Sequence, residues 1–370
     1  MKLRLLSLFT LLCLLFSMTA CLGQPNGADT STTTDGSDDG STTTTGGSPD
    51  DTPADKLTLT NALDLTAEWN KVAAEGSLVQ GCVVVRKAFL EENPDAVEHF
   101  LAEYEASINY LSTNLDEAAQ MIVDNGIFTS APVAKKAIPK CNVCFLDGAE
   151  MKTAMNTYLG ILQGINSNAM GGTLPADDFY YARKSAESNA SCGKTINVYT
   201  LNGTTGFGMA KLMSDAKSSN TLESYAFSVQ SDATIVTAAL INGSADIAAL
   251  PTNAASTVYN KTGGEVCVIA VNTLGCLYLL TNQNQTVNSF ADLRGKTVYV
   301  PAQNPTFIFT YLCKMNGLEI GKDITIDSTT YAKPADLRTA VAAGLVDIAV
   351  LPEPMVTIAI NTVNAANAQK

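Results

Sequence analysis

One nonapeptide pattern, G-x-x-D-I-A-x-L-P, occurs twice in this chain, as GSADIAALP at residues 243–251 and as GLVDIAVLP at residues 344–352. In each copy the glycine suits the left-handed end of a helix. The aspartate starts a short apolar strand, and the proline ends strand pairing because it lacks an N–H. The repeat therefore predicts two similar units, each with a buried strand between a helix and a loop.

The segments around the two copies correspond step by step. Strand-like and helix-like stretches alternate from residue 195 to residue 251, and the same series restarts near residue 291. This alternation predicts βαβ units and a mainly parallel sheet, and hence an α/β fold. Before both series, we expect a long strand at residues 78–89 and a helix from Pro94 capped by Asn93. Further helices are expected at residues 115–126 and 148–164.

The first residues have the pattern of a secretory signal. Lys2 and Arg4 precede an apolar run at residues 5–16, and small residues lead to Cys21. We expect residues 1–21 to be a lipoprotein signal with Cys21 as the lipidated residue; an ordinary cleaved signal remains the alternative. Residues 22–56 are expected to form a disordered tether, because residues 23–55 carry seven Asp and no Lys or Arg. A solubilising leader is the other interpretation.

Composition and cysteine placement argue against several functions. The net charge of −13 makes nucleic-acid binding an unlikely role. Seven cysteines follow Cys21, an odd number scattered in apolar runs, which is a poor disulfide framework. Cys141 and Cys144 have redox or metal spacing, but no second pair and no histidine accompany them, so buried thiols are favoured. The single histidine, His99, lies beside the apolar stripe of a helix, and no catalytic motif is present. We therefore expect no enzyme activity, no metal and no cofactor.

Several segments together resemble a known family. They are INVYTLNGTTGFGMAKLM, DIAALPTNAA, LRGKTVYVPAQNPTF, DIAVLPEP and VVVRKAFLEENPDAVEHFLAEYEAS. These segments resemble the solute-binding proteins of ABC importers, in the nitrate/sulfonate/taurine class that also includes thiamine-precursor binders. The resemblance implies a two-lobed periplasmic-binding-protein-like (type II) α/β fold with hinge strands. It also implies a monomer that closes on a small solute and docks on an ABC permease.

The order of these segments differs from that of the family. Family members begin with a strand like INVYTL and end with a segment like DDFYYARK, which here lie at residues 196–201 and 177–184. The stretch that usually follows the PEP segment stands at residues 57–72. The chain is therefore expected to be circularly permuted, with residues 185–194 joining the former ends. Lobe I would comprise residues 78–283, and lobe II residues 57–77 and 284–370. A truncated tandem pair, or a rearranged gene whose product folds poorly, remains an alternative.

Candidate ligand-binding residues follow the carboxyl ends of predicted strands, where α/β sheets bind ligands. A Gly-rich turn at the start of a helix offers free N–H groups to an anion, and Glu353 would favour a ligand that carries an amine. The alternatives are tight turns, helix caps, solvated loops and, for Glu353, a hinge-side hydrogen bond. Trp69, the only tryptophan, is expected to pack rather than to stack on a ligand. The candidates are Asn202, Gly203, Thr204, Thr205, Gly206, Thr252, Asn253, Gln303, Asn304, Thr306 and Glu353.

The sequence thus predicts an extracytoplasmic, lipid-anchored receptor of an ABC importer. Its solute would be small and anionic or zwitterionic, such as a sulfonate, taurine or nitrate, or else an aminopyrimidine. An enzyme of the same fold that acts on a pyrimidine, and a surface sensory module, are the alternative functions.

Overall fold

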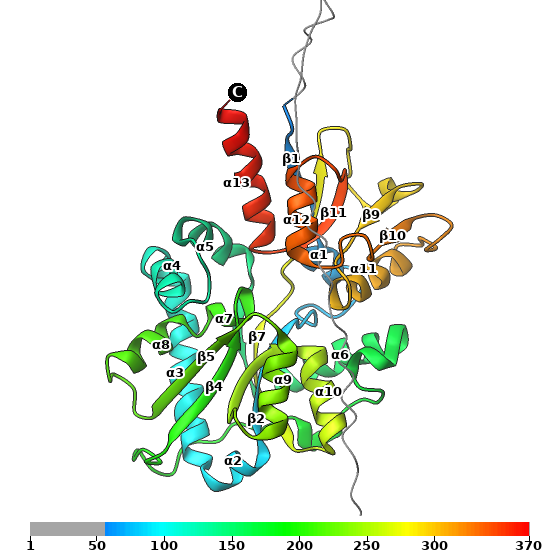
Figure 1. Ribbon diagram of the computed structural model, residues 1–370. Helices are drawn as coiled ribbons and strands as arrows, with labels where there is room; N and C mark the ends of the chain where they lie inside the picture. The colour runs from blue at the N-terminus through cyan, green and yellow to red at the C-terminus, as the bar shows by residue number, and fades with distance from the viewer. Residues whose placement is uncertain (1–55, 370) are drawn as a thin grey trace, which may run out of the picture. The chain divides into compact units, whose positions relative to one another are not determined.

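The computed structural model describes residues 56–369. The expected signal, Cys21 and the expected tether up to residue 55 lie outside the described residues. The described chain forms two separate β-sheets, which define two lobes (Figure 1). Lobe I holds a six-stranded sheet of order β3-β7-β2-β6-β4-β5, and lobe II a five-stranded sheet of order β1-β8-β11-β9-β10.

The strands of the two sheets are contributed by alternating parts of the chain. Lobe I contains β2 (Gly81–Arg86), β3 (Val143–Leu146), β4 (Thr195–Leu201), β5 (Ser224–Gln230), β6 (Ile247–Pro251) and β7 (Val266–Thr273). Lobe II contains β1 (Leu59–Asp64), β8 (Leu277–Asn282), β9 (Thr297–Tyr299), β10 (Thr325–Asp327) and β11 (Ile348–Pro352).

Helices cover both faces of each sheet. In lobe I, one face carries α3 (Pro94–Thr113) and α8 (Ala210–Lys217), and the other carries α9 (Ala233–Asn242) and α10 (Thr252–Thr262) (Figure 1). In lobe II, one face carries α12 (Pro334–Ala342) and α13 (Met355–Ala368), and the other α1 (Leu65–Asn70) and α11 (Asn304–Met315). The remaining helices are α2 (Lys87–Glu92), α4 (Leu115–Asp124), α5 (Ala131–Ala137), α6 (Gly148–Asn166) and the single turn α7 (Thr204–Phe207).

The predicted repeat is confirmed by the order of the strands. The order β5-β4-β6-β2-β7 in lobe I corresponds to β10-β9-β11-β8-β1 in lobe II. In both sheets the first three strands are parallel to one another, and the next two are antiparallel to their neighbours. The expectation of mainly parallel sheets was therefore wrong: both sheets are mixed. The reason is that β2 and β8 arrive from the opposite lobe and enter the sheet in the reverse direction.

The aspartate of each repeat holds the far end of the strand that arrives from the other lobe. The backbone N–H of Arg86, at the end of β2, donates to the carbonyl of Asp246 at 3.0 Å. The N–H of Asn282, at the end of β8, donates to the carbonyl of Asp347, also at 3.0 Å. Gly243 and Gly344 have φ of +81° and +72°, as the predicted left-handed helix ends require. In each lobe, the aspartate of the repeat thus binds the end of the strand that crosses from the other lobe.

Several local predictions differ from the structure. The strand expected at residues 78–89 ends at Arg86, because α2 begins at Lys87. The Asn93 side chain does not cap α3; its Nδ2 donates back to the carbonyl of Phe89 in α2. Cys144 lies in β3, a short edge strand of the six-stranded sheet that the sequence analysis did not identify.

Between residues 56 and 369 the chain changes lobe at two places. The first lies between α1 and β2, and the second lies between Thr273 at the end of β7 and Leu277 at the start of β8. The boundary expected after residue 283 differs from this, because the whole of β8 lies in the five-stranded sheet. One hydrophobic core cluster includes side chains from both sheets, among them Val84, Leu250, Leu279 and Val350. The two lobes therefore share part of their core at the crossing.

The two described ends of the folded part lie beside each other. The side-chain amide of Asn367, near the end of α13, donates to the carbonyl of Leu57 at 2.7 Å. The Lys56 ammonium donates to the carbonyl of Asn367 at 3.2 Å. The start of β1 and the end of α13 are thus held together by reciprocal contacts. Among residues 56–369, no helix has both the length and the apolar character that a membrane crossing requires.

Candidate functional site

The carboxyl end of β4 in lobe I contacts the carboxyl end of β11, the repeated strand of lobe II. The Thr204 hydroxyl, after β4 in lobe I, donates to the backbone carbonyl of Glu353, after β11 in lobe II, at 2.8 Å. The turn that carries Thr204 depends on two glycines. Gly203 has φ of +87°, and a Cβ at Gly206 would collide with the backbone oxygen of Leu201. The predicted Gly-rich turn is therefore a close backbone packing that presents Thr204 to the other lobe.

A series of hydrogen bonds connects the two crossing segments, which form the hinge, to the residues that follow the two repeats. The N–H of Thr252, after β6, donates to the carbonyl of Gln80 at 3.1 Å, and the side-chain oxygen of Gln80 accepts the N–H of Cys276 at 2.7 Å. The carbonyl of Cys276 in turn accepts the N–H of Glu353 at 2.9 Å. Gln80 and Cys276 each belong to one of the two crossing segments. The residue that follows the proline of each repeat is therefore tied to a hinge residue, with Gln80 joining the two halves.

The side chain of Glu353 is turned into the protein and not into open space. Glu353 is only 1% exposed, and its two carboxylate oxygens accept the hydroxyl of Thr357 at 2.9 Å and the Thr357 N–H at 3.2 Å. Burial raises the pKa of Glu353, although the bonds from Thr357 and the charge of Lys140 oppose the rise. The carboxyl group thus satisfies the start of α13, which is the hinge-side role that the sequence left open.

Lys140 is a residue of this region that the sequence analysis missed. Its ammonium lies 3.9 Å from the Glu353 carboxylate, and its side chain is 47% exposed. Its backbone carbonyl accepts the Tyr278 hydroxyl at 2.8 Å, so the residue is fixed from lobe II although it ends a 3₁₀ turn of lobe I (Ile138–Lys140). No motif in the sequence marks Lys140. Its one distinguishing feature is that it precedes Cys141, in a part of the chain far from the repeats. Lys140 supplies a partly exposed positive charge next to the Thr204–Glu353 contact.

Two thiols complete the surroundings of Thr204. Burial raises the pKa of Cys276 to about 12 and that of Cys141 well above its usual range, with the Thr204 hydroxyl acting in the opposite sense on both. Both thiols are buried, and neither forms a disulfide. The other cysteines of residues 56–369 are also free: Cys82, Cys267 and Cys313 are buried, and Cys144 and Cys192 are half-buried. Neutral, buried thiols are poor nucleophiles and poor metal ligands. Within residues 56–369, no group of three or more His, Cys, Asp or Glu side chains is placed to hold a metal ion.

The second predicted turn, at residues 303–306, contacts a different partner. Gln303 is exposed with φ of +67°, and the Thr306 hydroxyl donates to the carbonyl of Pro301 at 2.7 Å. The side-chain oxygen of Asn304 accepts the Tyr158 hydroxyl at 2.6 Å. Tyr158 belongs to α6, so this bond is a further polar link between the lobes. It does not bring Asn304 to Thr204.

An aromatic cluster lies beside that link. The Trp69 ring is fully buried, with its centroid 4.8 Å from that of Tyr311 and 5.9 Å from that of Tyr158. Its indole N–H donates to the Ser77 hydroxyl at 2.9 Å. Trp69 is therefore a packing residue of the hinge, as expected from the sequence.

The remaining candidates are mostly engaged within lobe I. The Asn202 N–H donates to the carbonyl of Gln230 and extends the β4–β5 pairing, and the Thr205 carbonyl accepts the Asn272 side chain at 3.2 Å. The Asn253 side chain donates to the carbonyl of Ala169, while its oxygen is buried without a partner, as is the hydroxyl of Thr252. Five of the cavities on the described chain, with volumes of about 240 to 420 Å³, are lined by no predicted site residue.

Comparison with known protein families gives a match over part of the chain. Residues 218–367 match a family model described as "ABC transporter, phosphonate, periplasmic substrate-binding protein". This part of the chain is therefore similar to the substrate-binding proteins of ABC transporters, and the two-lobed α/β architecture is periplasmic-binding-protein-like. The family model that matches is the one that describes phosphonate transporters. The match spans the end of lobe I and most of lobe II, and a search of curated proteins gives no match.

Three solved structures are also similar over part of the chain. The alkanesulfonate-binding protein SsuA of Xanthomonas axonopodis pv. citri, bound to MOPS, is 18% identical over 43% of this chain, with a TM-score of 0.28. An ABC transporter protein of Parabacteroides distasonis is 21% identical over 45%, with a TM-score of 0.32. The periplasmic aliphatic sulphonate binding protein SsuA of Escherichia coli is 18% identical over 48%, with a TM-score of 0.33. The matched part spans 55%, 55% and 58% of these chains, little more than half of each.

Proposed function

We propose that this protein is an extracytoplasmic receptor that binds a small anionic or zwitterionic solute between its lobes and delivers it to an ABC permease. One observation carries the proposal: two sheets of equivalent strand order meet at their carboxyl ends, and two segments of the described chain cross between them. This is where α/β sheets bind ligands, and two crossings allow the lobes to hinge. The match to a substrate-binding family model supports the same function.

The chemistry around Thr204 favours an oxyanion. The turn offers the Thr205 side chain, the start of a helical turn and, in exchange for its bond to the Glu353 carbonyl, the Thr204 hydroxyl. Lys140 adds a half-exposed positive charge. A phosphonate or sulfonate group accepts hydrogen bonds from such donors and pairs with an ammonium. Glu353 is engaged by Thr357, so it contributes negative potential rather than an open ligand position. Alkylphosphonates and alkylsulfonates, including their amino derivatives, are therefore the first solutes to test.

Thermal-shift screening followed by calorimetry tests the proposal. We expect an alkylphosphonate, alkylsulfonate or taurine to raise the melting temperature by mass action, whereas nitrate and aminopyrimidines should act less. Lys140→Gln should weaken binding of the active solute about tenfold, since it removes a charge-assisted contact. Lys135→Gln is the matched control, because Lys135 pairs with Asp116 at an exposed position. Failure of every solute to shift the melting temperature would reject the proposed solute class, and equal effects of the two variants would remove Lys140 from the site.

We also propose that the chain is circularly permuted relative to the family. The contact between Asn367 and Leu57 supports it, because the two segments that a relative would join directly already touch. Residues 185–194 would be the bridge between the former ends. A chain reopened at residue 189 and joined from residue 369 to residue 57 should fold and bind the same solute. Loss of the folded state in that chain, with the parent stable under the same conditions, would contradict the permutation.

Membrane attachment through Cys21 is the last part of the proposal. It rests on the sequence pattern alone, since Cys21 lies outside the described residues. Radiolabelled palmitate should be incorporated into the expressed protein and not into a Cys21→Ala variant. Equal labelling, or none in either, would refute lipidation at Cys21.

A further inference from the structure

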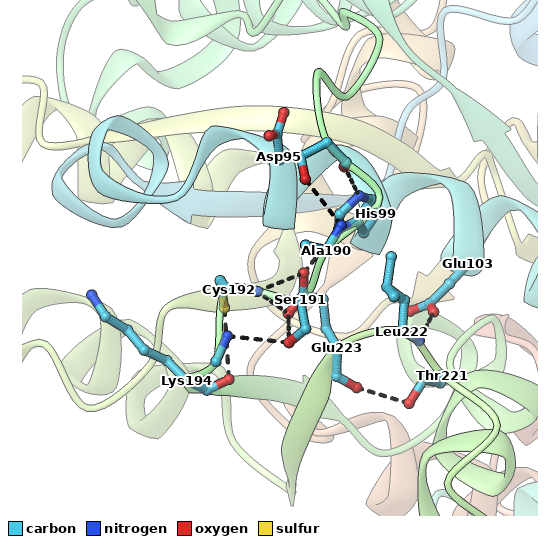
Figure 2. Close-up of polar contacts among 12 residues, drawn as sticks. Asp95, His99, Glu103, Ala190, Ser191, Cys192, Lys194, Thr221, Leu222 and Glu223 are labelled. Atoms are coloured by element: carbon cyan, nitrogen blue, oxygen red, sulfur yellow. Dashed lines mark hydrogen bonds and ion pairs between the residues drawn. The ribbon is translucent and has the colours of Figure 1, made fainter.

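Residues 185–194, named here the connector, are held to lobe I by a compact set of polar contacts (Figure 2). The Glu223 carboxylate, just before the edge strand β5, accepts the Ser191 hydroxyl at 2.9 Å and the Cys192 N–H at 3.0 Å. The Glu187 N–H donates to Asp95 in α3 at 2.8 Å. The connector is therefore attached to α3 and to the start of β5 mainly through side-chain carboxylates.

His99, the only histidine of the chain, links these two attachment points. Its Nδ1 lies 2.8 Å from Glu223 Oε1, and its Nε2 lies 2.8 Å from the carbonyl oxygen of Ser188 in the connector. A carbonyl oxygen and an ionised carboxylate can only accept hydrogen bonds, so each ring nitrogen has to donate. A neutral imidazole carries one N–H and could satisfy only one of them. The geometry therefore requires an imidazolium.

The groups around His99 favour its positive charge. Its side chain is 8% exposed and that of Glu223 is 0% exposed. Burial alone would lower the pKa of His99, but the bonds to Glu223 and Ser188 outweigh it and raise the pKa above 6.5, with the charges of Glu223 and Asp95 acting in the same sense. Burial opposes ionisation of Glu223, yet the bonds from His99, Ser191 and Cys192 lower the pKa of that carboxyl below 4.5.

The other titratable groups near the pair have partners of their own. On α3, Glu98 accepts the Tyr181 hydroxyl and the Lys184 N–H, and Glu103 accepts the Tyr225 hydroxyl. In the connector, burial raises the pKa of Cys192, so it stays a neutral thiol. At the end of the connector, Lys194 pairs with Glu92. With these groups engaged elsewhere, His99 and Glu223 are the charged pair that holds the connector.

We propose that His99 and Glu223 form a pH-dependent clasp that fixes the connector onto lobe I and releases it when either member loses its charge. The clasp is intact between two limits. As pH rises through the raised pKa of His99, the imidazolium loses a proton, and the bond to Ser188 or to Glu223 is lost. As pH falls through the lowered pKa of Glu223, the carboxylate is protonated and its bonds to Ser191, Cys192 and His99 weaken. Release would free the connector and uncover the start of the edge strand β5.

A histidine NMR titration tests the protonation state directly, because a chain with one histidine gives one imidazole signal. In the full folded chain without an affinity tag, we expect both ring nitrogens to be protonated at pH 7 and the transition to lie above pH 6.5. A neutral tautomer at pH 7 would overturn the proposal. This measurement uses the unaltered protein, so it stands even if a variant fails to fold.

Hydrogen exchange at the Cys192 amide, corrected for the intrinsic pH dependence, tests the release. We expect its protection to fall about tenfold or more as His99 loses its proton. The reason is that His99 then loses its hydrogen bond to Glu223 or to Ser188, and a hydrogen bond that involves a charged group contributes at least this much. His99→Gln should have low protection at every pH, because an amide cannot supply the two opposed donors. Lys194→Gln is the control at the exposed end of the connector and should behave as the parent does. Protection that is unchanged across the titration, or equal in the parent and His99→Gln, would refute the clasp.

Discussion

Replacing the aspartate of each repeat by asparagine should separate two positions that the sequence makes equivalent. Asp246 is 7% exposed, and its carboxylate accepts the Arg86 guanidinium at 2.8 Å and the Asn197 N–H at 2.9 Å. Asp347 is exposed, and its carboxylate accepts the Asn282 side-chain amide. The first aspartate thus holds a charged partner and two further donors from Asn197, whereas the second holds a neutral amide.

The expected magnitudes follow from these partners. In Asp246→Asn, one acceptor becomes an NH₂ group, which then faces either the guanidinium or the Asn197 N–H. A hydrogen bond to a charged group contributes about 1.5–3 kcal/mol. The Arg86 side chain is 26% exposed, and water recovers part of the loss, so we expect a cost of about 2 kcal/mol. In Asp347→Asn, the amide oxygen still accepts from Asn282 at an exposed site, so the cost should stay below about 0.5 kcal/mol.

Urea unfolding monitored by far-UV circular dichroism measures both variants against the parent. The Arg86→Met background supplies the control, because Asp246→Asn should cost less than about 1 kcal/mol once the guanidinium is absent. Equal destabilisation by the two aspartate substitutions would refute the reasoning. It would mean that the shared role in docking a crossing strand dominates, and that the difference in partner and burial does not matter.

Three further predictions follow from the packing and the charges of the site. Gly206→Ala should destabilise the fold by about 1–3 kcal/mol, because the added Cβ collides with the Leu201 carbonyl. Gly160→Ala has open space at a helical position and should stabilise the fold by about 0.5–1 kcal/mol. Thermal unfolding that ranks the two variants otherwise would contradict this. Because burial raises the pKa of Glu353, its contribution to stability should increase as pH falls through that pKa, and Glu353→Gln should flatten this part of the stability profile; parallel profiles would argue against it. Thr204→Val removes one hydrogen bond between the lobes, which contributes about 1 kcal/mol. The ratio of open to closed molecules should therefore rise about fivefold in single-molecule distance measurements, and an unchanged ratio would be the contrary result.

The sequence specified the architecture because its signals are local and repeated. A glycine, an aspartate and a proline at fixed spacing define where a helix ends and a strand begins and stops, and each does so by backbone geometry alone. Two copies of that pattern, with equivalent neighbours, were enough to predict two related lobes. The direction of β2 and β8 could not be deduced in the same way. It depends on where the chain crosses between the lobes, and apolar strands look alike whichever way they run.

The candidate site was less accessible to sequence reasoning, because side-chain direction decides it. Glu353 follows a strand end, where a carboxylate could face a ligand, but the adjacent start of α13 supplies Thr357 as a nearer partner. Lys140 carries no motif and comes from a segment far from the repeats. Its place beside Glu353 arises from packing between the lobes, as the bond from Tyr278 to its carbonyl shows. Non-local contacts of this kind leave no periodic trace in a sequence.

The hinge explains why the repeat ends in the same way in both lobes. In each copy, the residue after the proline donates its N–H to a residue of a crossing segment, Gln80 in one case and Cys276 in the other. The aspartate at the other end of the same strand holds the far end of the incoming strand. Each repeated strand therefore fixes both ends of a strand that comes from the other lobe. Any motion between the lobes must then arise in the crossing segments that precede these fixed strands, between Asn70 and Gly81 and between Thr273 and Leu277.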